Sequence, residues 1–443
     1  MPKFKRNAKA SKPSNALDPN LKIEDANSRT TAARLIYLHR QHGDIPSRRL
    51  DGLTRDRAFV TELVLGVIRN ERALEWIIGQ LASKQPSEKL VPVLMVGLYQ
   101  LLFLDHVEPY AAIHETVESC KTICGESKSG FVNAILRRAL READDLHKRL
   151  QKQSVAIRYS HPDQLVARWT QEFRADDAAA LCEWNNERPT ISLRSRSAAQ
   201  LEVLVHDLQA AGIPAQASVH PEFIDLGNFT RIAELPGYHE GTFTVQDPAT
   251  LLSVDLLDPK SDEIVLDACA APGGKTIAIA DRLGVSGKLV ATDINAKRLE
   301  RLKDNLVRCR CEQVDVRCLD ATTFQPSDFG DLRFDAILLD VPCSNTGVIR
   351  RRPEARRQLT STQLQQLLEL QAALIDRSVP LLADGGRLVY STCSLELEEN
   401  EQQIAQAVKR HRGLKLIQEG RRFPPRDQCD GAYAAILKLS SDN

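Results

Sequence analysis

Two cysteines stand just past segments that we interpret as buried strands. Cys343 lies in DVPCSNTG, directly after the apolar run RFDAILL, and Cys393 lies further along in GRLVYSTCS. A cysteine is more often a small core residue than a reactive group, but a place at the end of a strand beside small polar residues favours a chemical role for this pair. A core role is expected for five others, Cys182, Cys309, Cys311, Cys318 and Cys429.

A thiolate with a second acid–base group beside it could modify a pyrimidine ring. Carbon 5 of cytosine is a poor nucleophile, and attack of a thiolate at carbon 6 turns the ring into an enamine that can accept a methyl cation. Because an ordinary thiol has a pKa of about 8.5, its surroundings must help it to ionise. A base must then take the proton from carbon 5 before the thiol is expelled, and Cys343, or Asp340 near it, is placed to serve.

A methyl donor could bind beside the thiols, where neighbouring strands end. Gly273 and Gly274 of DACAAPGGKT open a helix after the first strand, so that the backbone can approach a ligand closely. Asp293 ends the second strand at the spacing where an acid accepts hydrogen bonds from ribose hydroxyls. Asp320 and Asp340 end the third and fourth strands. A tight strand-to-helix turn would explain the glycines alone, but three acids in order favour a nucleoside without a pyrophosphate.

We therefore expect S-adenosylmethionine as the cofactor. In this interpretation Asp293 binds the ribose, Asp320 binds the adenine amino group, and Asp340 lies near the reactive methyl group. Such an arrangement needs a parallel sheet, because ligands of open parallel sheets bind outside the carboxyl ends of the strands.

The segments after residue 240 predict such a sheet. Strand-like segments such as EIVLDA, GKLVATD and FDAILLD alternate with helical ones such as NAKRLERLKDNLVRC and a long helix near Gln363 to Leu382. This alternation predicts a Rossmann-like α/β domain over residues 241–443, with a parallel sheet and helices on both faces.

Three further parts are predicted upstream. Residues 1–26 are basic and polar, which is typical of a flexible tail. Residues 27–148 repeat apolar positions at helical spacing, as in TRDRAFVTELVLGVIRNERALEWII, and predict an all-helical domain. Residues 149–240 combine the strand-like ERPTISLRSRS and PEFIDLG with the helix-like AAQLEVLVHDLQAAG, and predict a small α/β linking module.

The composition is that of a globular protein without a membrane anchor. The 443 residues exceed what one core usually serves, so two or three domains are expected. The 59 basic and 59 acidic residues cancel, so a polyanionic partner must be met by local patches. The run VPVLMVGLYQLLFL from Val91 is too short to cross a bilayer, and no signal peptide is visible. We expect a cytoplasmic monomer with ten reduced cysteines and no bound metal, because no Cys or His set has zinc spacing.

A basic run follows the first of the two thiols. The segment IRRRPEARR contains Arg350, Arg351 and Arg352. Because arginine pairs well with phosphate oxygens, we expect these three residues to contact RNA, with a plain solvated loop as the alternative.

The motifs DACAAPGGKT, DVPCSNTGVIRRRPE and LVYSTCSLELEEN occur in one chain. Together they resemble the signature motifs of the Sun-type (Nol/Nop/Sun) family of RNA cytosine-5 methyltransferases. The resemblance implies a class I methyltransferase domain in which Cys393 is the nucleophile and Cys343 assists product release. It places the cofactor contacts on Cys269, Ala270, Ala271, Pro272, Gly273, Gly274, Lys275, Asp293, Asp320 and Asp340.

The resemblance extends over nearly the whole chain. RDRAFVTELVLGVIRN and GFVNAILRR look like a NusB-type RNA-binding helical domain, and YSHPDQLVARW with NERPTISLR looks like the module that joins it to the catalytic domain. This arrangement is similar to the RsmB-type (Sun, Fmu) members of the family, which implies methylation of one cytosine in 16S ribosomal RNA. The chain departs from the usual motifs at Val341, at Asn345 and in DGAYAAIL. None of these removes a reacting atom, but Asn345 could narrow the base pocket or add a contact.

Three other functions stay open at this point. The protein could act on transfer RNA or on another ribosomal cytosine, although the NusB-like segment speaks against this. It could be a non-catalytic RNA-binding protein that keeps the fold as a scaffold, or a methyltransferase of small molecules. The intact thiols and acids speak against the second function, and the third would not need two cysteines.

Overall fold

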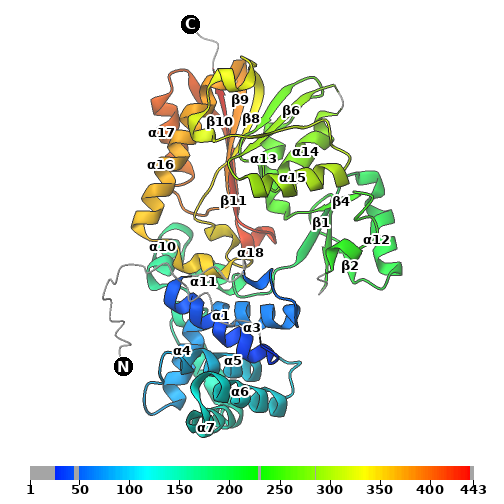
Figure 1. Cartoon of the computed structure of the whole chain (residues 1–443). Coiled ribbons are helices and arrows are strands. Elements are labelled where there is room, and N and C mark those ends of the chain that lie inside the picture. Colours follow the sequence, from blue (N-terminus) through cyan, green and yellow to red (C-terminus); the bar gives the residue numbers. More distant parts are fainter. Residues whose placement is uncertain (1–24, 44–48, 228–230, 285, 440–443) are drawn as a thin grey trace. The chain divides into compact units, whose positions relative to one another are not determined.

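The computed structural model describes residues 25–43, 49–227, 231–284 and 286–439 (Figure 1). The chain divides into two compact units, a helical unit over Met1–Gln153 and an α/β unit over Ser154–Asn443. Residues 1–24, which make up most of the predicted basic tail, lie outside the described residues. The predicted domain limits at residues 26, 148 and 240 stay predictions.

The described part of the helical unit consists of helices, as the spacing of its apolar residues predicts. α1 begins where the side chain of Asn27 accepts hydrogen bonds from the backbone amides of Arg29 and Thr30, and it ends at Gly43 in the left-handed conformation. The apolar run that contains Val91 forms a largely buried helix. No helix among the described residues has both the length and the apolar character to cross a bilayer. The helices are α1 (Ser28–His42), α3 (Arg57–Arg69), α4 (Glu71–Leu81), α5 (Leu90–Phe103), α6 (Pro109–Cys124), α7 (Ser129–Arg141) and α8 (Ala143–Gln151).

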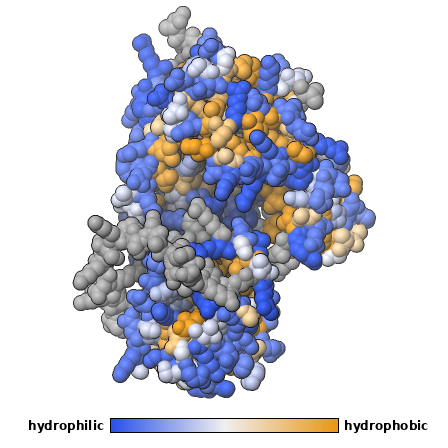
Figure 2. All heavy atoms as spheres, in the orientation of Figure 1, coloured by the Kyte–Doolittle hydropathy of each residue, from blue (hydrophilic) through white to orange (hydrophobic). Residues whose placement is uncertain are grey.

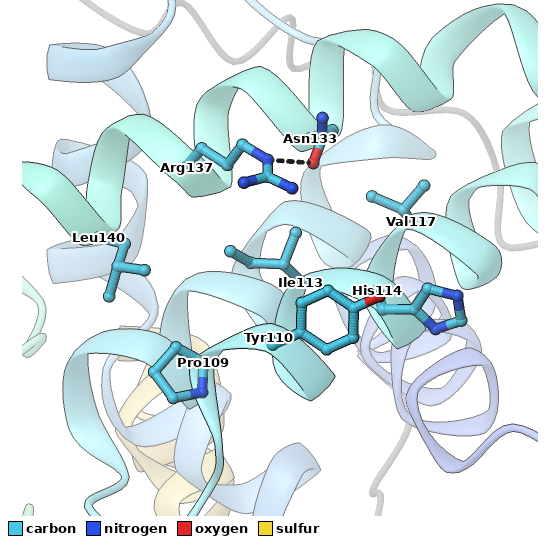
Figure 3. A pocket seen from close by; sticks show the side chains of 8 residues that line it. All are labelled: Pro109, Tyr110, Ile113, His114, Val117, Asn133, Arg137 and Leu140. Atoms are coloured by element: carbon cyan, nitrogen blue, oxygen red, sulfur yellow. Dashed lines mark hydrogen bonds between the residues drawn. The ribbon is translucent and has the colours of Figure 1, made fainter.

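A groove of about 400 Å³ opens between α6 and α7 of the helical unit (Figure 3). Tyr110 and His114 of α6 stack with their ring centroids 6.1 Å apart. On the α7 side, Arg137 Nε donates a hydrogen bond of 3.0 Å to Asn133 Oδ1. The lining contains none of the predicted cofactor or catalytic residues.

The α/β unit contains a small antiparallel sheet with strand order β2-β3-β1-β4. Leu193 and Ile224 of this sheet pack against Leu204 and Leu208 of α12 in one buried cluster. This confirms the small α/β module that the sequence predicts. Its elements are β1 (Ile191–Ser195), α12 (Leu201–Ala210), β2 (Ala215–Ala217), β3 (Phe223–Leu226) and β4 (Phe243–Val245). The helices before it are α9 (Val155–Arg158), α10 (Asp163–Phe173) and α11 (Ala175–Trp184).

The rest of the α/β unit is a larger domain built around a seven-stranded sheet with the order β10-β11-β9-β8-β5-β6-β7. The five strands from β9 to β7 in this order are parallel, which confirms the Rossmann-like fold. β10 and β11 pair antiparallel at one edge, an addition that the alternating pattern does not predict. The strands are β5 (Ile264–Asp267), β6 (Lys288–Asp293), β7 (Asp315–Cys318), β8 (Phe334–Asp340), β9 (Leu382–Thr392), β10 (Leu414–Arg422) and β11 (Ala432–Leu439).

Helices cover both faces of the large sheet, as Figure 1 shows. Successive residues of β5 point to opposite faces: Val265 packs with Ile277 of α14, whereas Leu266 packs in the cluster that contains Ile375 of α16. In Figure 2 hydrophobic side chains gather on the visible face of this domain, while its margins are mostly hydrophilic. The helices are α13 (Leu251–Leu257), α14 (Gly274–Leu283) and α15 (Ala296–Arg308) on one face, α16 (Ser361–Ser378) and α17 (Glu401–Arg410) on the other, and the short α18 (Pro424–Asp427).

The ten cysteines are all free thiols. Four of the five expected core cysteines are buried, namely Cys182, Cys309, Cys311 and Cys429. The core prediction is wrong for Cys318, which is exposed because it ends the edge strand β7. Among the described residues, no group of three or more His, Cys, Asp or Glu side chains could hold a metal ion.

Candidate active site

The carboxyl ends of the parallel strands meet at one edge of the large sheet. Asp293 at the end of β6 lies in register with Cys318 of β7, and Asp340 at the end of β8 lies in register with Ser391 of β9. Asp267 ends β5, the strand between β6 and β8. The chain then leaves β8 and β9 directly into the two loops that carry the predicted thiols.

The structure brings the two predicted cysteines into contact. Cys343 Sγ and Cys393 Sγ lie 3.2 Å apart, at hydrogen-bonding distance for two sulfur atoms. The hydrogen bond to Cys393 and burial together raise the pKa of Cys343 well above its ordinary value. Cys343 therefore holds its proton strongly.

Asn345, one of the departures from the usual motifs, adds a contact to this pair. Its Oδ1 lies 3.3 Å from Cys393 Sγ, and its Nδ2 donates to the backbone carbonyl of Cys343 at 2.9 Å. The residue adopts the left-handed conformation with φ of 61°, which asparagine tolerates better than most residues. The side chain of Asn345 thus contacts both cysteines, and the two sulfur atoms still lie in contact with each other.

Lys275 and Asp340 form an ion pair beside the thiols. Lys275 Nζ lies 2.7 Å from Asp340 Oδ2, and Ser391 Oγ donates to Asp340 Oδ1 at 3.0 Å. Burial lowers the pKa of Lys275, but the charge of Asp340, its hydrogen bond to the lysine and the nearby Cys393 and Asp267 together outweigh this, so the net direction is upward. Cys393 is among the groups that favour the charged lysine. The ammonium group of Lys275 therefore lies in the neighbourhood of the Cys393 sulfur.

The predicted cofactor loop, Cys269–Lys275, is held tightly against α15. Gly273 has a φ of +107°, and a Cβ atom there would lie 2.4 Å from Cδ1 of Leu302. A side chain at this position would be strained and would clash, so the turn requires glycine. Arg298 of α15 donates to the carbonyl of Ala271. The loop is thereby positioned directly before the N-terminus of α14.

Asp267 is a site residue that the sequence interpretation missed. It is 1% exposed; its Oδ2 accepts a hydrogen bond of 2.7 Å from Thr276 Oγ1, while its Oδ1 has no hydrogen-bond partner among the described residues. Burial raises the pKa of Asp267 to about 7, and the charges of Asp340 and Asp293 add to this. A signal existed, because Asp267 ends a strand of the sheet just as Asp293 and Asp340 do.

The carboxylates of Asp293 and Asp320, two further predicted acids, accept hydrogen bonds from the turns that follow their strands. Asp293 Oδ1 accepts a hydrogen bond of 2.8 Å from the backbone amide of Asn295. Asp320 lies two residues beyond the end of β7, and its Oδ1 accepts from the amide and the hydroxyl of Thr322 at 2.9 and 2.6 Å. Both carboxylates therefore lie at the carboxyl ends of the parallel strands.

Three family models match successive parts of the chain. The NusB family matches residues 26–141, the RsmF/B-like ferredoxin-like domain matches residues 161–233, and the family described as 16S rRNA methyltransferase RsmB/F matches residues 254–438. The chain is 36% identical over 440 residues to the ribosomal RNA small subunit methyltransferase B of Yersinia enterocolitica, covering 93% of this chain and 98% of that protein. It is 38% identical over 403 residues to the protein of the same name from Yersinia pseudotuberculosis, covering 87% and 91% of the two chains.

The chain belongs to the RsmB/F family of 16S rRNA methyltransferases. The order of the three matched segments agrees with the helical unit, the small sheet and the large sheet. A crystal structure of the protein PH0851 has the same fold, with a TM-score of 0.73 and 23% sequence identity over 94% of this chain and 99% of that chain.

In this RsmB/F family member Arg350 makes internal contacts. Its guanidinium donates to the carbonyl of Arg188 at 2.8 Å and lies over the ring of Trp184, 4.1 Å from its centroid. The residue is buried, and burial lowers its pKa. The expected phosphate contact is not supported for this arginine, because its charged group is turned into the protein.

Arg351 likewise joins distant segments of the fold. Its Nη2 lies 2.7 Å from Asp247 Oδ2, and its Nε lies 2.6 Å from Asp430 Oδ2. Two carboxylates already neutralise this guanidinium, so a contact to RNA phosphate is not supported here either. Arg352 is exposed and stays a candidate for that role.

Proposed function

We propose that the protein methylates carbon 5 of one cytosine in 16S ribosomal RNA, with S-adenosylmethionine as the methyl donor. The observation that carries the proposal is the distance of 3.2 Å between the sulfurs of Cys343 and Cys393. Methylation at carbon 5 needs a nucleophile on carbon 6 and a base for the carbon 5 proton, and two adjacent thiols can reach one ring. Relatives named for the small ribosomal subunit favour 16S RNA over transfer RNA.

The residues at the strand ends fit S-adenosylmethionine. The buried Oδ1 of Asp267, which has no partner among the described residues, suits an ammonium group. Asp293 suits ribose hydroxyls and Asp320 suits an adenine amino group, while Gly273 and Gly274 at the start of α14 carry no side chain. When bound, this cofactor supplies an electrophilic methyl group on a positively charged sulfur.

The roles of the protein's own groups follow from their positions. The thiol of Cys393 gives its proton to solvent, and the thiolate attacks carbon 6 with the ammonium of Lys275 and the S–H group of Cys343 beside it. After methyl transfer a base removes the proton from carbon 5; the ring double bond re-forms and the bond between sulfur and carbon 6 breaks. Cys343 can take this proton after its own has passed to solvent, and Asp340 is the second candidate for this step. The base then gives the proton to solvent, and Cys393 leaves as the thiolate.

Cofactor binding should depend on Asp293. Replacing it by alanine should weaken S-adenosylmethionine binding about 10- to 100-fold, because hydrogen bonds to a charged group contribute about 1.5–3 kcal/mol. Isothermal titration calorimetry measures this directly. Asp304→Ala, which removes an exposed acid from α15, is the matched control and should bind normally. An unchanged dissociation constant for Asp293→Ala would refute the ribose assignment.

Replacing Arg352 and replacing Arg351 should have different effects on RNA binding. Arg352→Ala should weaken RNA binding and reduce the slope of log affinity against log salt by about 0.7–0.9, the loss of one phosphate contact. Arg351→Ala should leave that slope unchanged but lower the free energy of unfolding by about 1–3 kcal/mol, since Asp247 and Asp430 lose their shared donor. Binding titrations at several salt concentrations and denaturant unfolding measure the two effects. A reduced salt slope for Arg351→Ala and an unchanged slope for Arg352→Ala would contradict the assignment of the phosphate contact to Arg352.

The RNA class can be tested with separated RNAs. We expect labelled methyl groups from the cofactor to enter 16S ribosomal RNA and not transfer RNA, and bisulfite sequencing to find the modified base at a single cytosine. Label in transfer RNA alone, or methylation at another ring position, would overturn the proposal.

A further inference from the structure

The residue after each thiol binds the same buried carboxylate. Ser344 follows Cys343, and Ser394 follows Cys393. The hydroxyls of both serines donate to Glu399 Oε2, the one from Ser394 at 2.5 Å. Glu399 lies in the segment between β9 and α17 and is 0% exposed. One carboxylate oxygen therefore links the loop that follows β8 to the loop that follows β9.

The other oxygen of Glu399 is held as firmly. Oε1 accepts hydrogen bonds of 2.9 Å from the backbone amide of Ser344 and from Nε2 of Gln371, a residue of α16. Gln371 Nε2 also donates to the carbonyl of Pro342 at 3.0 Å, directly before Cys343. The carboxylate thus receives four hydrogen bonds from three separate segments, and it can shift only if buried donors lose their partner.

Other contacts join the two loops besides the hydrogen bond of 3.3 Å from Cys393 Sγ to Asn345 Oδ1. The amide of Gly347 donates to the carbonyl of Cys393 at 2.9 Å, and the amide of Leu395 donates to Thr346 Oγ1 at 2.9 Å. These bonds keep the loops side by side. The carboxylate of Glu399 contacts the residue next to each thiol at once, so a small shift of this one group would change the distance between the sulfurs.

We propose that Glu399 is a positioning residue for methyl transfer, which holds the two thiols in contact so that one cytosine meets both of them. The inference rests on the proposed function, because the distance between the sulfurs matters only if both act on the same ring. The negative charge of Glu399 also contributes, after the hydrogen bond to Cys393 and burial, to the raised pKa of Cys343.

Two variants separate the length of this side chain from its charge. Glu399→Asp keeps the charge but is one methylene shorter, so it cannot reach both loops. Glu399→Gln keeps the volume and replaces one acceptor oxygen by a donor, which preserves packing if the shorter side chain fails to fold. Glu396→Gln is the matched control, since Glu396 is buried in the same loop but binds Trp169 Nε1 at 3.1 Å and Arg168 of α10.

The first readout is the geometry of the thiols, measured without RNA or cofactor. Dibromobimane alkylates two thiols and forms a cross-link only where they lie close together. Mass spectrometry should find the peptides of Cys343 and Cys393 bridged in the unmodified protein and in Glu396→Gln. In Glu399→Asp most of the reagent should be attached to one thiol only, without a bridge. The bridged fraction in Glu399→Gln should lie between that of Glu399→Asp and that of the unmodified protein. Bridging at the level of the unmodified protein in both Glu399 variants would overturn the proposal.

The second readout separates positioning from binding. In Glu399→Asp the kcat for methyl transfer should fall on the order of 100-fold, as expected when a reacting group is displaced by about 1 Å, while the KM for RNA and the affinity for S-adenosylmethionine stay near their normal values. A normal kcat would overturn the proposal. If bridging and kcat are unaffected while Cys393→Ala is inactive, the proposed function stands and only this inference fails. If Cys393→Ala retains full activity, both fail.

Discussion

Replacing Cys393 by alanine should abolish methyl transfer and remove every covalent adduct between protein and RNA. Without this sulfur nothing activates carbon 5, because its thiolate is the proposed nucleophile for carbon 6. We expect kcat to fall by about 10⁴- to 10⁶-fold, the scale seen when a covalent nucleophile is removed. Transfer of labelled methyl groups to 16S ribosomal RNA measures the rate, and denaturing gels reveal any adduct.

The control for this variant is Cys318, an exposed thiol of the same sheet. Cys318→Ala removes the sulfur at the end of β7 and should retain normal turnover, since that residue lies outside the thiol pair. Calorimetry should show that Cys393→Ala still binds S-adenosylmethionine. Turnover of Cys393→Ala close to the rate of the unmodified protein would contradict the assignment of the nucleophile.

Replacing Cys343 by alanine should have a different outcome, namely accumulation of a covalent complex between protein and methylated RNA. In this variant Cys393 can still attack, but the base that allows its release is missing. A denaturing gel should show a protein band shifted by the mass of the RNA after a single turnover. The double variant Cys343→Ala/Cys393→Ala should give no such band.

The two candidate bases can be distinguished in the same assay. If Cys343→Ala turns over normally without trapping RNA, its role in release is wrong, and Asp340 is left as the base. Asp340→Asn should then trap the complex. Loss of all activity in Cys343→Ala without an adduct would instead indicate that this thiol is needed for the attack.

The fold of the α/β domain could largely be predicted because parallel strands buried on both faces form short apolar runs between amphipathic helices. Segments such as FDAILLD and GKLVATD therefore stand out, and they form β8 and β6. β10, the sequence LKLIQEGRR, carries no such run because it lies at the sheet edge and is mostly exposed. The antiparallel pair of β10 and β11 was missed for that reason.

The thiols were predictable because each follows a strand that the pattern identifies, but their partners were not. Glu399 lies in LELEENE, an acidic run typical of a solvated surface, and it is buried only because serines from two loops and Gln371 surround it. The internal contacts of Arg350 and Arg351 could not be predicted from the arginine run for the same physical reason. The acids that neutralise Arg351 lie about 80 to 100 residues away in the chain, at Asp247 and Asp430, and spacing along a sequence cannot reveal such contacts.

The most direct test of a cysteine-linked mechanism uses 16S RNA that contains 5-fluorocytidine. Fluorine at carbon 5 cannot leave as a proton, so the unmodified protein should stop after methyl transfer with the RNA still attached. Mass spectrometry of the digested complex should find one methylated fluorocytidine bound to the peptide of Cys393. Attachment to Cys343, or methylated RNA with no attached peptide, would contradict the account.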